Sequence, residues 1–230
     1  MKKYSILFLL AIITVAGITK MRSSQQQEAM ATNDTEQEQT STTTQNTDEN
    51  ASIYPPKGIE IPRYNIERGG QTIEHIGYTV SYDADFKTPQ WVAWQLTKEE
   101  AYGTEARYNK FQPDPDVKGA KAYTTDYTNS GYDRGHMAPA ADMKWSHQAM
   151  VESFYMTNVC PQNRILNRGD WKDLEELERS WAIKYGCVSI AAGPIYYKEH
   201  TPQRIGGNKV AVPDAFFKVP LASSFCTSSM

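Results

Sequence analysis

The chain of 230 residues carries 24 basic residues (Lys and Arg) against 27 acidic residues, a formal net charge of −3. Residues 1–51 hold 4 of the basic and 6 of the acidic residues, which leaves 20 against 21 in residues 52–230. This balance excludes a nucleic-acid binder that relies on overall positive charge. A polyanionic partner would need a bound cation or a local group of arginines.

The N-terminal segment, residues 1–20, is typical of a signal peptide or an N-terminal anchor. Lys2 and Lys3 precede an apolar run over residues 6–13, and small residues at 15–17 favour cleavage. We therefore expect an exported protein that is secreted, periplasmic or envelope-anchored. Membrane contact is expected only if this segment stays uncleaved.

The remainder divides into a linker and one domain. Residues 21–51 are mostly Gln, Thr, Ser, Asn and acids, which predicts a disordered polar linker. Residues 52–230 are long enough for a single domain. The three cysteines allow one disulfide, but no C-x-x-C spacing occurs and no zinc site is predicted: Cys160, Cys187 and Cys226.

Along the domain, residues 77–82 and 90–97 are rich in aromatic and β-branched residues and flank a turn-rich link at 83–89. This pattern predicts two antiparallel strands. Residues 112–116 and 124–131 have the Pro, Asp, Asn and Gly content of loops.

A short helix is expected at 146–154, followed by a strand at 154–159. The clearest helix spans 170–185 and ends at Gly186. Its apolar residues recur at spacings of three and four and predict one core-facing stripe: Trp171, Leu174, Leu177, Trp181 and Tyr185. Polar side chains are expected on its other faces: Lys172, Glu176, Arg179 and Lys184.

Three further strands complete the pattern. Residues 187–194 predict a buried strand, and 209–213 with 216–219 predict a strand pair with an interruption. Because strands outnumber helices and most can pair antiparallel, we expect an α+β domain with a mixed or antiparallel sheet.

The stretch DRGHMAPAADM at 133–143 places His136 just before a proline that restricts the backbone. An imidazole held there can take a proton from water near neutral pH if a neighbour fixes its tautomer. The alternative is a histidine satisfied within a polar core, and His136 alone does not separate the two.

Asn167 stands where the chain enters the long helix, so its amide oxygen could bind a cation or simply cap the helix. Glu175 follows eight residues later, about 12 Å along a helix that rises about 1.5 Å per residue. At that separation Glu175 reaches a metal at Asn167 only through water.

Three segments together resemble the DNA/RNA non-specific endonuclease family. They are Asp-Arg-Gly-His at 133–136, Asn-x-x-Pro-Gln at 158–162 and Leu-Asn-x-x-x-Trp-x-x-Leu-Glu at 166–175. Their order and spacing agree with the family as well as their residue types, and the similarity extends from about 75 to 219. The resemblance implies a ββα-metal core, in which a strand pair and a helix carry the metal site.

What the resemblance implies for the site is specific. His136 matches the general base that activates water, Asn167 the residue that holds magnesium, and Glu175 an acid that supports the hydrated ion. Arg134 matches an arginine beside the site, and Arg107 is a looser candidate for a second phosphate contact, with a solvated surface arginine as the alternative. The supporting residues are expected to hold the site's loops rather than bind metal: Asp133, Asn158 and Gln162.

The implied reaction is magnesium-dependent hydrolysis of DNA and RNA that leaves 5′-phosphates, with manganese as a substitute ion. One Asn can suffice as a protein ligand because magnesium keeps several waters. Contacts confined to phosphate and metal read little sequence, so weak sequence preference is expected. No small-molecule cofactor is expected, and the oligomeric state is left open.

The other histidines are weaker candidates, and His147 is expected on a helix surface. Trp145, Trp171 and Trp181 could stack on bases, although aromatics at helical spacing usually belong to a core.

The segment after Val219 departs from the family, whose members continue with more sheet, so the domain is expected to lack C-terminal strands and to expose a sheet edge. Two alternatives to the nuclease therefore stay open. One is a catalytically impaired nucleic-acid-binding domain, and the other is a surface interaction domain presented by the linker.

Overall fold

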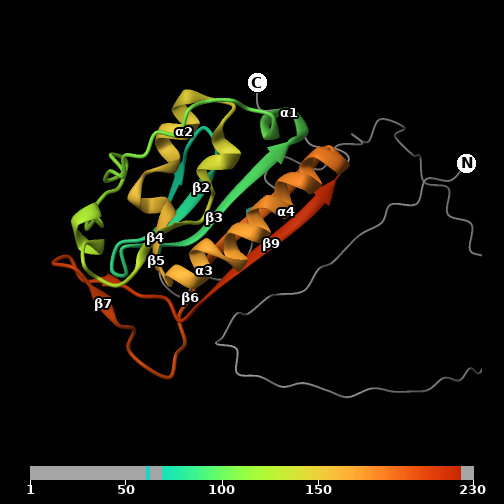
Figure 1. The fold of residues 1–230 in the computed structure, drawn as a ribbon. Helices are drawn as coiled ribbons and strands as arrows, with labels where there is room; N and C mark the ends of the chain where they lie inside the picture. Colours follow the sequence, from blue (N-terminus) through green and yellow to red (C-terminus); the bar gives the residue numbers. More distant parts are fainter. Residues whose placement is uncertain (1–60, 63–68, 224–230) are drawn as a thin grey trace, which may run out of the picture.

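The computed structural model describes residues 61, 62 and 69–223 (Figure 1). The leader or anchor expected at 1–20, the linker expected at 21–51 and the tail beyond 223 lie outside the described residues. Within the described part of the chain, no helix has the length and apolar character needed to cross a membrane.

A five-stranded antiparallel sheet forms the centre of the fold, in the order β1-β2-β3-β6-β9 (Figure 1). Its strands are β1 (Gln71–Glu74), β2 (Thr79–Asp83), β3 (Thr88–Thr97), β6 (Cys187–Ile195) and β9 (Ala215–Ser223). The strand pair expected at 77–82 and 90–97 is confirmed by β2 and β3, and the strand expected at 187–194 by β6. The α+β class with an antiparallel sheet is therefore confirmed.

The strand pair expected at 209–213 and 216–219 is wrong in its pairing. β8 (Val210–Ala211) pairs with β7 (Arg204–Ile205), whereas β9 pairs with β6 along its full length. The sequence pattern marks extended segments but not their partners, because β9 finds its hydrogen bonds on a strand about 20 residues earlier in the chain.

The strand expected at 154–159 begins later than predicted. α2 (His147–Ser153) ends with Phe154 as its C-cap, and a 3₁₀ turn, η3 (Met156–Asn158), precedes β5 (Val159–Gln162). The 3₁₀ turn takes its place because the Asn158 amide bonds the Tyr155 carbonyl. The helix expected at 146–154 is confirmed, with Ser146 as its N-cap.

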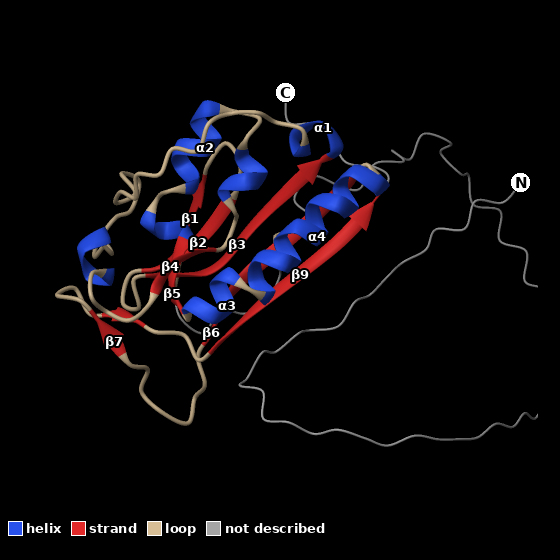
Figure 2. Cartoon of the chain, viewed as in Figure 1, coloured by secondary structure: helices blue, strands red, loops and turns tan. Residues whose placement is uncertain are grey.

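The remaining helices are α1 (Lys98–Ala101), α3 (Arg164–Arg168) and α4 (Asp170–Tyr185), with short 3₁₀ turns η1 (Thr124–Tyr127) and η2 (Ala140–Met143). α4 packs on β3, β6 and β9, and Figure 2 shows α3 and α4 following one another alongside the sheet. The bounds of the long helix agree with the prediction.

The face that α4 buries differs from the prediction. Trp171 is buried and Trp181 packs against the core as predicted, but Leu177 and Tyr185 are exposed, and Glu178 and Ala182 are buried in addition. The buried stripe therefore includes an acid, which hydropathy alone assigns to solvent. Glu178 is accommodated because a buried lysine from β9 faces it.

A hairpin followed by helices builds the unit that carries the site. β4 (Asp133–His136) pairs antiparallel with β5, and α3 and α4 follow directly. This order confirms the ββα arrangement expected from the sequence. Gly135 of β4 is buried and lies against Gln162 of β5. A Cβ at residue 135 would be only 2.6 Å from Cβ of Gln162.

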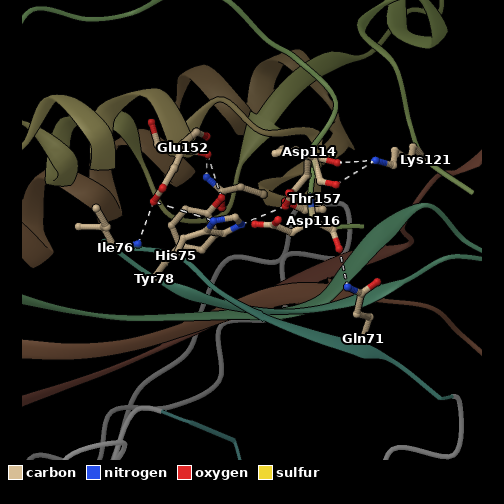
Figure 3. Close-up of polar contacts among 12 residues, drawn as sticks. Gln71, His75, Ile76, Tyr78, Asp114, Asp116, Lys121, Glu152 and Thr157 are labelled. Atoms are coloured by element: carbon tan, nitrogen blue, oxygen red, sulfur yellow. Dashed lines mark hydrogen bonds and ion pairs between the residues drawn. The ribbon is translucent and has the colours of Figure 1, made fainter. Parts of the chain in front are cut away.

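A buried polar cluster fastens the loop that follows residue 111 to the sheet (Figure 3). His75 Nε2 lies 3.0 Å from Asp114 Oδ2, and its Nδ1 lies 3.9 Å from Glu152 Oε2. Thr157 donates to the same Asp114 oxygen at 2.7 Å, and Lys121 Nζ donates to the Asp114 carbonyl at 2.8 Å. These bonds hold the chain at Asp114, three residues after Phe111, which lines the cavity described below.

Candidate active site

One cavity of about 540 Å³ gathers residues from β4, α3, α4 and the loop before residue 112. Six of the eight predicted site residues line it: Arg107, Asp133, Arg134, His136, Asn167 and Glu175. The other two, Asn158 and Gln162, are fully buried behind it. Residues separated by up to 68 positions in the sequence therefore meet at one concave surface.

His136 ends β4 and is fixed by aromatic packing. Its ring centre lies 5.1 Å from that of Phe111 and 5.0 Å from that of Phe154, and its carbonyl accepts a bond from Trp171 Nε1 at 3.1 Å. Nε2 is buried and has no hydrogen-bond partner among the described residues. Burial, reinforced by the charge of Arg107, lowers the pKa of His136 to about 3, so the imidazole is neutral at physiological pH.

Arg134 lies two residues before His136 on the same strand, so the two side chains share one face of it. Its Nη2 donates to the Thr124 carbonyl at 2.6 Å, and its guanidinium lies over the rings of Tyr127 and Phe111. Its Nε is buried without a partner among the described residues, and the side chain lines the cavity. This combination leaves a fixed cation with a free donor at the site.

Arg107 reaches the cavity from the loop that follows α1. Its guanidinium lies 5.0 Å from the ring centre of Phe154, and its Nε donates to Asn109 at 2.9 Å. Partial burial lowers the pKa of Arg107, and the charge of Glu175 opposes that shift. Although exposed, the side chain lines the cavity and makes no ion pair at short range with the described acids.

Asp133 organises α3. Its carboxylate accepts bonds from Arg168 Nε at 2.8 Å, Asn167 Nδ2 at 3.2 Å and Arg164 Nε at 3.4 Å. Burial raises the pKa of Asp133, but the bonds from Arg168 and Asn167 and the charges of Arg168 and Arg164 outweigh it and bring the pKa below its usual value. Asp133 thus holds α3, and no ion pair joins it to Arg134 in the described structure.

Asn167 lies within α3 rather than at the start of α4. The N-cap of α4 is Gly169, which makes no side-chain cap, so Asn167 does not cap the long helix. Asn167 Nδ2 donates a hydrogen bond to Asp133, and this sets the orientation of the Asn167 amide. Asn167 Oδ1 accepts no hydrogen bond from the described residues. An oxygen ligand at the cavity wall is therefore left free.

Asn158 and Gln162 are internal. Asn158 Nδ2 donates to the carbonyls of Ala138 and Ser153, both at 2.8 Å, and its Oδ1 accepts from the Ala138 amide at 2.9 Å. These bonds join the segment after His136 to the end of α2. Gln162 packs beneath Gly135, and its amide atoms are buried without partners among the described residues.

Glu175 lines the cavity from α4, with its side chain 14% exposed. Burial raises the pKa of Glu175 to about 7; Lys218 opposes the shift, Asp142 adds to it, and Arg179 and Arg107 oppose it. The carboxyl therefore titrates near neutrality, which is typical of groups at functional sites.

Four charged residues behind or beside Glu175 were not predicted as site residues: Asp142, Glu178, Arg179 and Lys218. Arg179 was expected on a solvent face, but its Nη1 bonds the buried Asp142 Oδ1 at 2.9 Å and its side chain lines the cavity. A signal was present for Lys218, since strand alternation puts it on the same face as the buried Phe216. Sequence patterns alone miss this cluster because they place charged residues on the solvent-facing sides of their elements.

The cavity concentrates positive charge in a nearly neutral chain. Its lining holds five basic side chains and three acidic ones: Arg107, Arg134, Arg168, Lys172 and Arg179 against Asp133, Glu175 and Glu176. An anionic ligand would therefore meet a local cationic excess.

A family model described as DNA/RNA non-specific endonuclease matches residues 56–225. The chain belongs to this family. Among its relatives, the mitochondrial nuclease EXOG of Danio rerio is 40% identical over 166 residues, which cover 68% of this chain and 48% of the relative. Human mitochondrial endonuclease G is 36% identical over 170 residues, covering 70% of this chain and 57% of that protein.

A solved structure supports the same assignment. The crystal structure of an EndoG/EndoGI complex, which concerns the mechanism of EndoG inhibition, has a TM-score of 0.60 and 34% identity, and covers 65% of this chain and 66% of that chain. This chain spans about half the length of the curated relatives it matches.

The relatives overturn one expectation. They are named as mitochondrial nucleases in fish, human and two yeasts, which contradicts a secreted location. The prediction of an exported protein is therefore wrong by this comparison. The N-terminal apolar run on which it depended does not identify a compartment.

The donor set suits a hard, hydrated cation, and the family is generally one of divalent-metal-dependent nucleases. The described residues contain no group of three His, Cys, Asp or Glu side chains that could hold a metal. The free Oδ1 of Asn167 and the carboxylate of Glu175 both lie at the cavity wall, and both would bind an ion through oxygen atoms. Oxygen donors with few protein ligands fit magnesium better than zinc.

Proposed function

We propose that this member of the family is a divalent-metal-dependent endonuclease that hydrolyses the phosphodiester bonds of DNA and RNA with little sequence preference. The observation that carries the proposal is the unpartnered Nε2 of a neutral His136 in a cavity with a cationic lining and a free Asn167 oxygen. A base, an oxygen ligand and phosphate-binding cations are the parts that this hydrolysis needs.

His136 is the general base in this proposal. A pKa of about 3 keeps the imidazole neutral and able to accept a proton, although it makes the free protein a weak base. A bound phosphate adds negative charge beside the ring, which raises its pKa and offsets the effect of Arg107. The imidazole thus becomes a stronger base when the substrate is present, and it takes the proton from the attacking water.

Asn167 would hold magnesium, or manganese in its place, through Oδ1, with Glu175 supporting the ion's waters. Such an ion supplies charge stabilisation at the phosphoryl oxygens and the leaving 3′ oxygen. Asp133 fixes the Asn167 amide, so the ligand oxygen is oriented before any ion binds. The products would carry 5′-phosphates.

The arginines have different availability for phosphate. Arg168 is engaged by Asp133, whereas Arg107 has no acid at short range and Arg134 keeps a free Nε. Guanidinium groups match non-bridging phosphate oxygens in geometry and charge. Since these contacts go to phosphate and not to base edges, weak sequence preference follows.

The test is digestion of supercoiled plasmid and of a structured RNA by the purified full chain, with magnesium, with manganese and with EDTA. We expect both substrates to be cut with either metal and neither with EDTA. Cleavage that persists in EDTA would contradict the metal requirement. A cooperatively folded preparation that retains nucleic acid without cutting it would instead identify a binding domain.

A further inference from the structure

A buried lysine lies behind the wall of the cavity. The side chain of Lys218, on β9, is 1% exposed, and its Nζ lies 4.5 Å from the ring centre of Trp171 and 5.4 Å from that of Trp94. The aromatic faces favour a cation, but an ammonium group withdrawn from water also needs compensating negative charge. That charge must come from another element.

The compensation comes from two glutamates on α4. Lys218 Nζ lies 3.3 Å from Glu178 Oε2 and 3.9 Å from Glu175 Oε1. The two acids are three residues apart, so they share one face of the helix. Glu178 is fully buried and does not line the cavity, whereas Glu175 does. Lys218 therefore connects the sheet to the carboxylate at the cavity wall.

The surrounding charges make this connection matter for Glu175. Burial raises the pKa of Glu175 to about 7, and Lys218 is the strongest opposing influence, ahead of Arg179 and Arg107. Asp142, buried and bonded to Arg179 and Trp94, acts in the other direction. The 3.9 Å contact with Lys218 therefore places a cation directly behind the Glu175 carboxylate.

We propose that Lys218 is a positioning residue for the metal site: its ammonium group, 3.9 Å from Glu175 Oε1, holds the Glu175 carboxylate in place from behind so that it faces the cavity. The inference rests on the proposed function, because it concerns the ion assigned to Asn167 and Glu175. Residues that orient a metal site from outside commonly change metal affinity by about 10- to 100-fold when they are removed.

The test measures manganese binding to the full chain without nucleic acid, by the loss of the free-ion signal in electron paramagnetic resonance. We expect Lys218→Met to weaken manganese binding by about 10-fold or more. The magnesium concentration that half-saturates DNA cleavage should rise by a similar factor, while the rate at saturating magnesium largely recovers. An unchanged manganese affinity would overturn the role of Lys218.

Companion variants separate positioning from general stability. Lys218→Met leaves Glu178 buried without its cation, so the double variant Lys218→Met with Glu178→Gln, which removes both charges of that pair, serves as the folded comparison. We expect the double variant to keep the metal defect, Glu178→Gln alone to bind manganese as the wild type does, and Lys218→Arg to restore part of the affinity. A defect of equal size in Glu178→Gln would overturn the proposal, since the buried pair and not Glu175 would then matter.

The wild-type chain separates a failure of the proposed function from a failure of the role of Lys218. Absence of magnesium-dependent cleavage by the wild type would contradict the proposed function itself. Normal cleavage by the wild type, together with wild-type manganese affinity in the double variant, would reject only the role of Lys218.

Discussion

His136 combines two properties that are rarely found together in a buried side chain. It is neutral, and its Nε2 has no hydrogen-bond partner among the described residues. An unmade bond of this kind costs stability, about 1–3 kcal/mol for a buried polar group. In the proposed function, His136 Nε2 is unpaired because it receives the proton of the attacking water, which accounts for this cost in stability.

We expect His136→Ala to lower the cleavage rate by about 10²- to 10⁴-fold, because the general base is lost while the phosphate contacts stay. Single-turnover cleavage of DNA, beside binding of the same DNA, would measure this. His147→Ala is the matched control, since His147 lies on the helix surface as expected from the sequence, with its side chain 72% exposed and paired with Glu105. A His136→Ala rate within tenfold of the wild type would exclude the assigned role.

Glu178 gives a pH-dependent contribution to stability with a defined sign. Burial raises the pKa of Glu178 to about 7 from an ordinary 4.5, and Lys218 opposes the shift. The folded chain holds this proton more tightly than the unfolded chain, so the stabilisation is fully present below pH 4.5 and is lost as the pH rises through about 7.

Glu178→Gln should therefore gain stability relative to the wild type as the pH rises through that interval. Urea unfolding of both proteins along the pH series measures the difference, with the exposed Glu176→Gln on the same helix as the control. A difference that stays constant with pH would show that Glu178 titrates normally.

At the scale of elements, the β4–β5 hairpin explains why glycine occupies the third position of the Asp-Arg-Gly-His stretch. The close approach of Gln162 leaves no room for a Cβ at residue 135. The motif is thus partly a packing requirement that sets the position of His136, the next residue.

Gly135→Ala should destabilise the chain by about 1–3 kcal/mol, the usual cost of overpacking a buried site. Chemical denaturation would measure the loss, and Gly207→Ala provides the control because a Cβ at residue 207 meets nothing within 4 Å. Equal stability of the two variants would mean that the strands separate to admit the methyl group.

At the scale of the whole molecule, the net charge is small while the cavity is cationic. With five basic side chains lining the cavity, attraction of a polyanion is confined to the place where chemistry occurs. Few phosphates are then neutralised, and the salt dependence of binding should be shallow for a nucleic-acid-binding protein.

Arg107→Ala should reduce the slope of log affinity against log salt concentration by about 0.9 on duplex DNA, the value for one phosphate contact. Fluorescence anisotropy on the slow-cleaving His136→Ala background gives the slope. Lys118→Ala, an exposed charge outside the cavity lining, should leave it unchanged. Equal slopes for the two variants would show that Arg107 is a solvated surface arginine that does not contact phosphate.

The sequence by itself determined the family, the α+β class, the limits of α4 and six residues of the cavity, because each is written in local periodicity or in motif spacing. Only the tertiary structure decided that β9 pairs with β6, that Asn167 belongs to a separate helix, and that Glu178 and Lys218 are buried together. Those outcomes depend on partners distant in the sequence. A charged residue can enter a core only when an opposite charge from another element meets it there.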